Sequence, residues 1–304
     1  MAVPMRNTDF RSVVEPILSK AFDGIYDQRA DEWKAVFKEF TGTPRNYHEE
    51  PVLFGFGAAP ELPDGMPVTY QAGGVLFIQR YVYRVYGLAF ALTMVLIEDG
   101  DHIRIGTIYA KHLAQSLIET KETLCAQIVN RAYTSGYNGG DGVVLGSASH
   151  PISGGSFSNL LTTAAVLSQT SVENLCIQIR NAVDNNGKRI RLNPVKLVLS
   201  PSNVFQGEVI LKSVLRTGAA NNDINPINSM GLFKGGQANL SRMTSTTQWG
   251  ILTDAPEGLK LAMRRPLQKS MEGDFETDSM RYKSTERYTP SWTDPRGFWS
   301  TPGV

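Results

Sequence analysis

Apolar residues recur at helical spacing in two parts of the N-terminal half of the chain. Between residues 101 and 136 they keep a 3.6-residue period, and neither Pro nor Gly occurs from Thr107 to Ser135. This pattern predicts one long helix over about 103–135, of about 45 Å at 1.5 Å per residue. Two shorter runs, from Phe10 to Ile25 and from Trp33 to Phe40, predict short amphipathic helices.

Alternating apolar residues predict strands in the next region. Val52, Phe54 and Phe56 alternate, and a second alternating run covers residues 68–85. The Pro- and Gly-rich stretch 57–67 separates the two runs, so we predict a long β-hairpin over 46–85. The apolar run 85–97 is shorter than the roughly 20 residues that span a bilayer, and it predicts a buried strand.

The second half of the chain predicts a smaller unit that mixes helix and strand. Helical spacing covers residues 159–183 and 203–214, and the β-branched run 195–199 lies between them. Alternating residues return from Trp249 onward. The order of elements therefore predicts an α+β fold in which a second unit is inserted between strands of the first.

Composition adds limits on function. The 304 residues carry 30 Lys and Arg against 29 Asp and Glu, which argues against a basic nucleic-acid wrapper. Only 19% of residues are charged, and this leaves neutral surface for contact with other chains. Cys125 and Cys176 are expected to be reduced and partly buried. The first residues lack the apolar core of a signal peptide.

Candidate chemistry is weak. The glycine-rich stretch 138–142 follows a helix, whereas a phosphate cradle follows a strand, so a plain turn is favoured. The four histidines, His48, His102, His112 and His150, lack zinc-ligand spacing, and we predict no catalytic residue, cofactor or metal. A serine hydrolase using Ser147 or Ser149 with His150 is an alternative, although a solvated or interface turn explains those residues better.

Two further groups have two readings each. Glu98, Asp99 and Asp101 precede the long helix and are expected to cap it, with a divalent site as the weaker alternative. The C-terminal aromatic residues alternate with Arg and Lys, as on surfaces that stack single-stranded nucleic acid. An edge strand that packs against a neighbour is favoured because acidic residues are interleaved with them.

Several stretches together resemble a known family. Residues 128–145, IVNRAYTSGYNGGDGVVL, running on to Ser149-His150-Pro151, resemble the end of the spine helix and the following loop of tailed-bacteriophage major capsid proteins with the HK97-type fold. Residues 286–299 resemble the family's closing segment, and 194–210 resemble a strand and helix of its axial domain. The order of the parts carries much of the resemblance.

The resemblance implies an HK97-like α+β fold with four regions. Residues 1–45 would be an N-terminal arm, and 46–85 would be the extended hairpin called the E-loop. A peripheral domain with the spine helix would combine 86–157 and 249–304, and an axial domain would occupy 158–248. The aromatic and apolar residues expected to contact neighbouring subunits are Phe10, Trp33, Phe37, Phe54, Phe56, Leu62, Met66, Trp292, Phe298 and Trp299.

The implied function is a non-enzymatic coat protein that assembles into the hexamers and pentamers of an icosahedral shell around a double-stranded DNA genome. Its implied partners are itself, a separate scaffolding protein, the portal, a decoration protein and weakly held DNA, with no membrane. The implied place is the virion capsid, assembled in the host cytoplasm. An encapsulin-like protein shell is the alternative within this fold.

Two features depart from some members of the family. The chain has no Lys between Lys38 and Lys111, so a covalent crosslink through a hairpin lysine is not expected. Some members carry a long scaffolding region that is cleaved from the N-terminus. The 45 residues before the predicted hairpin are too few for one, which is why a separate scaffolding protein is expected.

Overall fold

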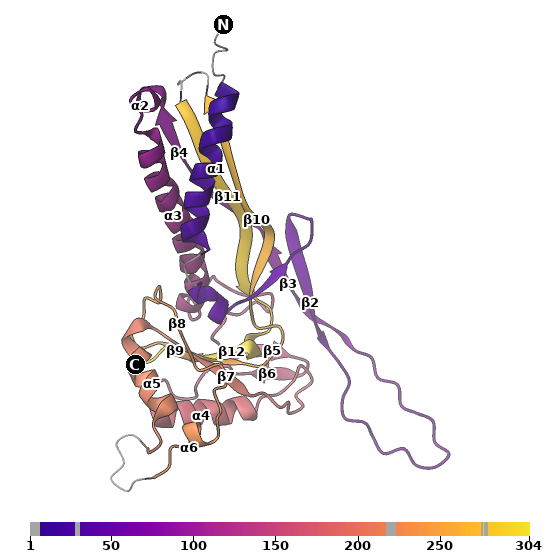
Figure 1. Cartoon of the computed structure of the whole chain (residues 1–304). Helices are drawn as coiled ribbons and strands as arrows, with labels where there is room; N and C mark the ends of the chain where they lie inside the picture. Colours follow the sequence, from indigo (N-terminus) through magenta and orange to yellow (C-terminus); the bar gives the residue numbers. More distant parts are fainter. Residues whose placement is uncertain (1–6, 28–30, 217–222, 275, 277–278) are drawn as a thin grey trace.

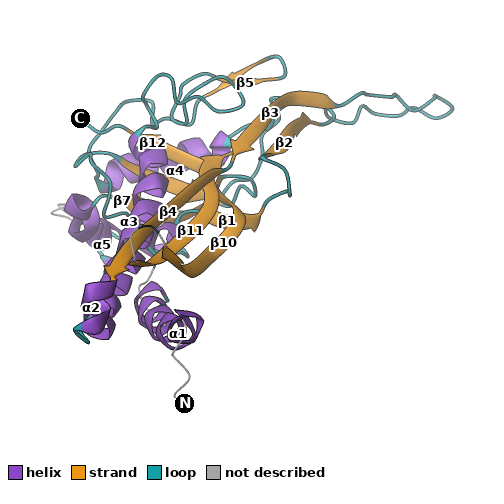
Figure 2. Ribbon diagram, turned by 90° about the horizontal axis from the view of Figure 1, so that it is seen from above, coloured by secondary structure: helices purple, strands orange, loops and turns teal. Residues whose placement is uncertain are grey.

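Two four-stranded sheets organise the chain, described here from a computed structural model that covers residues 7–27, 31–216, 223–274, 276 and 279–304. A long sheet carries two helices on one face, and a smaller sheet carries two others (Figure 1). A hairpin projects away from both sheets, as Figure 2 shows from above. The mixture of helix and sheet confirms the predicted α+β class.

The long sheet has the strand order β1–β10–β11–β4. Its strands are β1 (Lys38–Thr41), β10 (Leu259–Asp274), β11 (Ser279–Trp292) and β4 (Arg84–Thr93). Along β11, Tyr282, Glu286 and Tyr288 are buried, whereas Arg281 and Lys283 are exposed. This alternation means that one face of the sheet is covered, and it is covered by α1 (Asn7–Tyr26) and α3 (His102–Asn130).

The long helix is confirmed as α3, a single helix of 29 residues. Leu113, Leu117 and Val129 lie on its buried side, as the apolar period predicts. The helix ends at Asn130, five residues before the predicted end, because residues 131–133 form a turn that leads into the next loop. Gly136, with a φ of 92°, closes a second turn there and does not cap the helix itself.

The smaller sheet has the strand order β12–β9–β7–β8. Its strands are β12 (Phe298–Thr301), β9 (Trp249–Thr253), β7 (Pro194–Leu199) and β8 (Gln237–Asn239). The helices α4 (Gln169–Arg180) and α5 (Val204–Lys212) pack on one face, over Leu197, Trp249 and Trp299. The ranges expected to form the axial and peripheral domains, 158–248 and 249–304, each contribute two strands to this one sheet.

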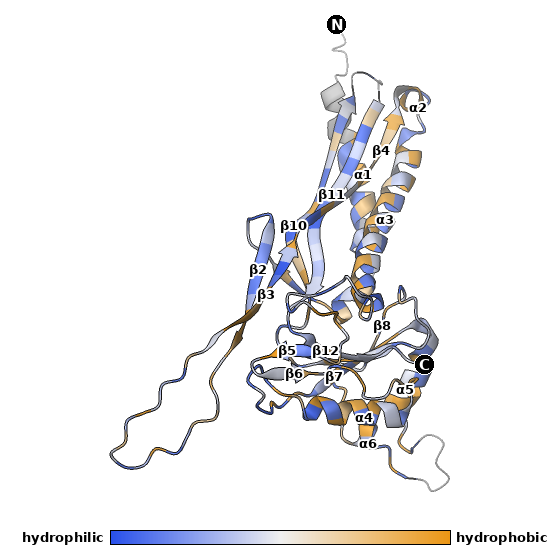
Figure 3. Cartoon of the chain, turned by 180° about the vertical axis from the view of Figure 1, so that it is seen from behind, coloured by the Kyte–Doolittle hydropathy of each residue, from blue (hydrophilic) through white to orange (hydrophobic). Residues whose placement is uncertain are grey.

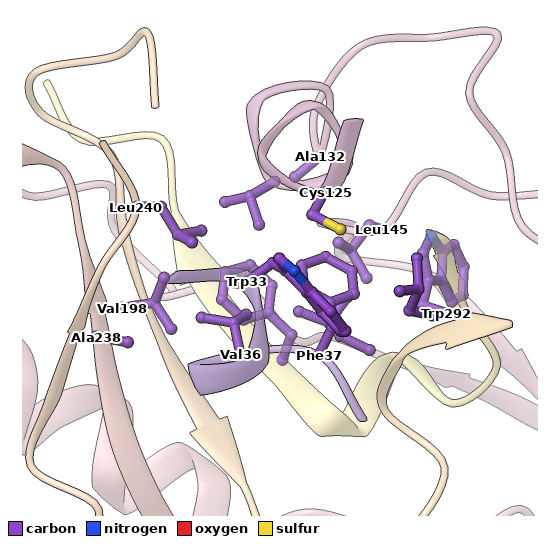
Figure 4. Close-up of a cluster of buried hydrophobic side chains, with 14 of the residues drawn as sticks. Trp33, Val36, Phe37, Cys125, Ala132, Leu145, Val198, Ala238, Leu240 and Trp292 are labelled. Carbon is purple, nitrogen blue, oxygen red and sulfur yellow. The ribbon is translucent and has the colours of Figure 1, made fainter. Parts of the chain in front are cut away.

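A shared core joins the two sheets. Trp33 and Phe37 lie between the C-terminal part of α3, β7 and β8 of the smaller sheet and the ends of β10 and β11 (Figure 4). Figure 4 also shows Cys125 and Trp292 in this cluster. Cys125 and Cys176 are free and buried, as predicted for reduced thiols.

Short elements connect these parts. The hairpin consists of β2 (Tyr47–Phe54) and β3 (Gly74–Val82), and a smaller hairpin consists of β5 (His150–Ile152) and β6 (Gly155–Phe157). The short helices are η1 (Glu32–Ala35), α2 (Met94–Glu98), η2 (Pro201–Asn203), α6 (Pro226–Ser229) and η3 (Pro295–Gly297).

The predicted helix over 33–40 is wrong. Residues 32–35 form one 3-10 turn, and the chain then extends as β1, which pairs in parallel with β10. The turn buries Trp33, Val36 and Phe37, so their helical spacing reflects one turn of burial and not a full helix. Pairing with β10 overrides the local preference of the strand residues.

Two other predictions needed correction. The run 85–97 is a strand only as far as Thr93 and then becomes α2. It is only partly buried, because Leu92 is 1% exposed whereas Val85 and Leu88 are 58% and 51% exposed. The helical spacing from residue 159 marks a helix only from Gln169, where the side chain of Ser168 caps the first turn of α4. Before that, Leu160 pairs with Ser300 as an isolated bridge.

The acidic residues before α3 do not cap it through their side chains. Asp101 occupies the N-cap position without a capping hydrogen bond and instead pairs with Arg104 at 3.3 Å. Glu98 is the last residue of α2. No group of three or more His, Cys, Asp or Glu residues within the described ranges is arranged to hold a metal ion.

Glu122 of α3 holds the turn η1 in place. Its two carboxylate oxygens accept hydrogen bonds from the backbone N–H groups of Glu32, at 2.8 Å, and Trp33, at 3.1 Å. Glu122 is buried, and this burial raises its pKa to about 7 despite the two donors. The Glu32 side chain in turn accepts from the N–H of Ser241 at 2.8 Å, so this network links α3, η1 and the smaller unit.

We predict that Glu122 makes the subunit less stable as the pH rises. A carboxyl whose pKa is raised on folding binds more protons when folded, so its destabilising effect is absent below its unfolded pKa and complete above about 7. The free energy of unfolding should fall by about 3 kcal/mol between pH 4.5 and pH 8 from this group. Glu122→Gln should remove that decline in urea denaturation; parallel pH profiles of the two proteins would contradict the assignment.

Candidate functional site

The hairpin formed by β2 and β3 is the most unusual surface of the molecule. Its strands pair in antiparallel register from Tyr47 opposite Val82, at the root, to Phe54 opposite Gly74. Residues 55–73 continue beyond the paired strands without helix or strand and extend away from the rest of the chain (Figures 1 and 2). The predicted hairpin is confirmed, with a longer unpaired distal segment than the predicted tip at 57–67.

A polar network anchors the root of the hairpin to the long sheet. Lys260 of β10 donates to both oxygens of Glu50, at 2.8 and 2.9 Å, and the hydroxyl of Thr293 donates to the same carboxylate at 2.5 Å. Tyr81 of β3 shares a hydrogen bond with Thr293. Burial alone would raise the pKa of Glu50, but the donors outweigh it and hold that pKa below its usual range.

Further hydrogen bonds connect the hairpin to β11 and to neighbouring loops. Gln79 donates to the hydroxyl of Ser291 at 3.0 Å and accepts from the backbone N–H of Gly140. The side-chain amide of Asn185 donates to the carbonyl of Leu53 at 2.7 Å, and that of Asn186 donates to the carbonyl of Gly55 at 2.6 Å. The hairpin therefore leaves the subunit in one direction, which these side chains determine.

The distal segment exposes apolar side chains that its own subunit does not cover. Of the residues predicted to contact neighbours, Phe56, Leu62 and Met66 are 60%, 55% and 61% exposed, and Phe54 is half-buried. Figure 3 shows hydrophobic positions along this projecting segment. The other exposed apolar residues of the hairpin are Leu53, Val68, Tyr70, Val75, Ile78 and Val82. Soluble monomers rarely expose so continuous a set.

Five predicted contact residues lie inside the subunit instead. Trp33, Phe37, Trp292, Phe298 and Trp299 are each less than 5% exposed. They fill the shared core and the core of the smaller sheet, because the ends of β10, β11 and η1 converge there. This corrects their assignment to contacts between subunits. Phe10 lies in α1, but its side chain is outside the described residues.

The alternative serine site is not assembled. His150 is fully buried, contrary to the predicted solvated turn, and its Nδ1 lies 2.6 Å from a carboxylate oxygen of Asp141. Its Nε2 lies 3.2 Å from the carbonyl of Leu145 and 3.2 Å from the side-chain oxygen of Asn159. The hydroxyls of Ser147 and Ser149 contact each other at 3.5 Å. Both ring nitrogens of His150 are engaged by Asp141, Leu145 and Asn159, so neither accepts a proton from a serine hydroxyl as a catalytic pair requires.

The buried His150 belongs to a structural network that the sequence did not indicate. Asn159 is fully buried, accepts from the N–H of Ser147 at 2.9 Å and donates to the carbonyl of Phe298 at 3.0 Å. Such a satisfied buried amide ties the loop after α3 to the C-terminal strand. In the sequence, Asn159 is marked only by its position at the edge of a neutral stretch. Many surface residues share that property, so it does not indicate burial.

One of the charged residues near the C-terminus, Glu286, lies in the protein interior. Glu286 of β11 pairs with Lys121 of α3 at 2.6 Å and accepts from the Tyr26 hydroxyl at 2.5 Å. Both members of this ion pair are buried. The alternation of aromatic and charged residues therefore reflects a sheet packed against α1 and α3. β11 pairs with a strand on each side, β10 and β4, so it is an inner strand and not the expected edge strand. Across the described ranges, no helix is both long and apolar enough to cross a membrane.

Comparison with known proteins bears on this geometry. Residues 81–301 match a family model described as phage capsid protein. No curated protein matches the sequence. The matched range begins inside β3 and includes every strand of the two four-stranded sheets except β1.

Solved structures share the fold at low sequence identity. The chain is similar to a capsid protein of the cyanophage P-SCSP1u, with a TM-score of 0.56, 12% identity and coverage of 91% of this chain and 89% of the other. It is also similar to a virus-like particle protein from Pyrococcus furiosus, with a TM-score of 0.53, 11% identity and coverage of 94% and 98%. A third similar structure, described as Microbacterium phage Oxtober96, has a TM-score of 0.54 and 11% identity, with coverage of 91% of this chain and 92% of the other. The HK97-like fold class is thus confirmed.

A pair of substitutions should separate core from surface. Trp33→Ala should lower the free energy of unfolding of the isolated subunit by about 3–5 kcal/mol, because it leaves a cavity in the shared core. Phe56→Ala should change it by less than about 0.5 kcal/mol, since this side chain is 60% exposed. Denaturant unfolding of both variants tests this difference, and equal effects would show that Phe56 is packed within its own subunit.

Proposed function

The chain belongs to the phage capsid protein family and is a structural protein of the capsid; on that premise we propose that it is the major coat subunit of a tailed double-stranded DNA phage. The subunits assemble into hexamers and pentamers of an icosahedral shell that encloses the genome. Likeness to structures described as a cyanophage capsid and as a virus-like particle supports self-assembly.

The observation that carries this proposal is the anchored but uncovered hairpin. Its root is held by the partly buried ion pair of Lys260 and Glu50 and by several hydrogen bonds, while Phe56, Leu62 and Met66 remain exposed at its distal segment. A two-stranded hairpin alone is marginal in water. Holding an apolar segment out in a fixed direction is favourable only when a second surface covers it, and identical subunits supply such surfaces in a closed ring.

The regions of the subunit take the following roles in this proposal. Residues 1–45 act as the N-terminal arm, and 46–85 act as the E-loop that lies on a neighbour. Residues 86–157 and 249–304 form the peripheral domain, and 158–248 form the axial domain near the five- and six-fold centres. The strands β9 and β12 then belong to the peripheral range by sequence. β9 pairs with the axial β7 and β12 pairs with β9, which supports a rigid connection between the two domains.

The proposed partners follow from the same assembly. A separate scaffolding protein, a portal and a decoration protein would act with the shell, which would form in the host cytoplasm. Packaged DNA would be held weakly and in a salt-dependent way, since the net charge of the chain is only +1.

An encapsulin-like shell is the second candidate. The similarity to the virus-like particle from Pyrococcus furiosus extends over 98% of that chain, so the fold fits both uses. Purified particles that contain double-stranded DNA would favour the phage coat, and particles that contain protein cargo would favour the encapsulin-like shell.

Deleting residues 57–67 tests the role of the hairpin. The subunit should remain folded, because these residues are exposed, and shells visible by negative-stain microscopy should become rare. Replacing the same residues by a Gly and Ser linker of equal length keeps the chain length and should have the same effect. Wild-type protein that forms no rings or shells would contradict the coat function, and shells of normal yield from both variants would contradict the role of the hairpin.

A further inference from the structure

Four arginines gather where the hairpin joins the long sheet. Arg264 donates to the carbonyl of Pro44 at 3.1 Å, and Arg287 donates to the side-chain oxygen of Asn46 at 2.5 Å. Arg45 lies between those two acceptors in the same turn and is exposed. Arg265 of β10 stands opposite Arg287 of β11 in the strand register. We call Arg45, Arg264, Arg265 and Arg287 the arginine cluster.

The cluster has no anionic partner of its own. None of its members forms an ion pair with a carboxylate in the part of the chain that the structure describes. The Nε atoms of Arg264, Arg265 and Arg287 are shielded from solvent and lack a hydrogen-bond partner among the described residues. Like charges directly opposite on neighbouring strands destabilise a sheet, and buried unpaired donors cost further free energy. An anion beside the guanidinium groups would offset the repulsion between these like charges.

The hairpin has an excess of negative charge, opposite in sign to the arginine cluster. From residue 46 to residue 79 the chain has four acidic residues and neither Lys nor Arg. Glu49 pairs with Arg80, and Glu50 pairs with Lys260. Glu61 and Asp64 remain exposed at the tip without an ion pair among the described residues. They lie on either side of Leu62 and Pro63, where the N–H of Met66 donates to the carbonyl of Pro63 at 3.1 Å and closes a tight turn over residues 63–66.

The tip cannot reach the cluster of its own subunit. The turn 44–46 precedes Tyr47, which pairs with Val82 at the root, and the tip lies beyond the other end of the same strands. Figure 1 shows the hairpin leading away from β10 and β11. The two complementary surfaces therefore lie at opposite ends of the hairpin, which is the arrangement of a head-to-tail contact between copies.

The apolar residues match as well as the charges. Val82 and Val85, which border the cluster on β3 and β4, are 49% and 58% exposed. Val85 stands beside Arg287 in the register of β4 and β11. The landing surface thus combines guanidinium groups with exposed valines, and the tip combines carboxylates with Leu62 and Met66.

We infer that the arginine cluster of one subunit binds Glu61 and Asp64 at the hairpin tip of a second copy of this chain. The inference rests on the proposed coat function and adds the site where the hairpin ends on its neighbour. The carboxylates offset the positive charge of the guanidinium groups across the interface, while Leu62 covers the exposed valines. The other anion that could occupy the cluster is a phosphate of nucleic acid, which is an outcome of the test.

Charge reversal and exchange test the contact. Arg264→Glu with Arg287→Glu, and separately Glu61→Lys with Asp64→Lys, should each lower the yield of sedimenting shells by about tenfold or more. The four substitutions combined in one chain should restore most of the yield. Lys283→Glu, an exposed charge on the same face of β11 away from the turn 44–46, is the matched control and should leave the yield unchanged.

Each outcome decides the inference. The inference is overturned if either double substitution assembles normally. It is also overturned if the variant with all four substitutions assembles as poorly as the double substitutions while its thermal unfolding is unchanged. Normal shells that lose salt-resistant DNA would assign the cluster to nucleic acid and also overturn it. If the arginine reversals do not fold, Arg264→Gln with Arg287→Gln replaces them, and the same loss of shells is expected. Wild-type protein that forms no shells would instead count against the proposed function.

Discussion

The fixed root of the hairpin is the constraint on which the rest of the subunit's behaviour depends. A charged Lys260 and Glu50 are taken out of water there, which costs free energy unless every remaining donor and acceptor is satisfied. Thr293 and Tyr81 complete that set. Because the root cannot swing, the exposed side chains of the distal segment cannot fold back onto their own subunit. Their burial requires another chain, so local packing at the root leads to assembly.

The shared core gives that root something rigid to be fixed to. Trp33 lies between the end of α3 and the smaller sheet, and Glu122 holds its backbone from the side of α3. The same turn reaches the smaller unit through Glu32 and Ser241. The segment around η1 therefore lies between the two sheets and contacts both of them.

Periodicity was informative where one element buries one continuous face. The long helix and the hairpin were predicted because their apolar periods run over many residues, and the family resemblance followed from their order. Trp33, Phe37 and Trp292 were misassigned because an aromatic residue has the same sequence signal in a core and at an interface. His150 and Asn159 were missed because their partners, Asp141 and the carbonyl of Phe298, are brought together only by tertiary contacts.

The distribution of charge makes one surface of the subunit complementary to another surface of a second copy. A net charge of +1 could describe a surface with mixed charges everywhere, but here Glu61 and Asp64 at the tip of the hairpin are separated from the arginine cluster at its root. A shell brings many identical subunits within a Debye length of one another, so a large net charge would oppose closure. Near-neutrality removes this repulsion, and the separation of signs within each subunit still provides attraction between its two ends. Both properties have to be present in one chain when every neighbour is another copy of it.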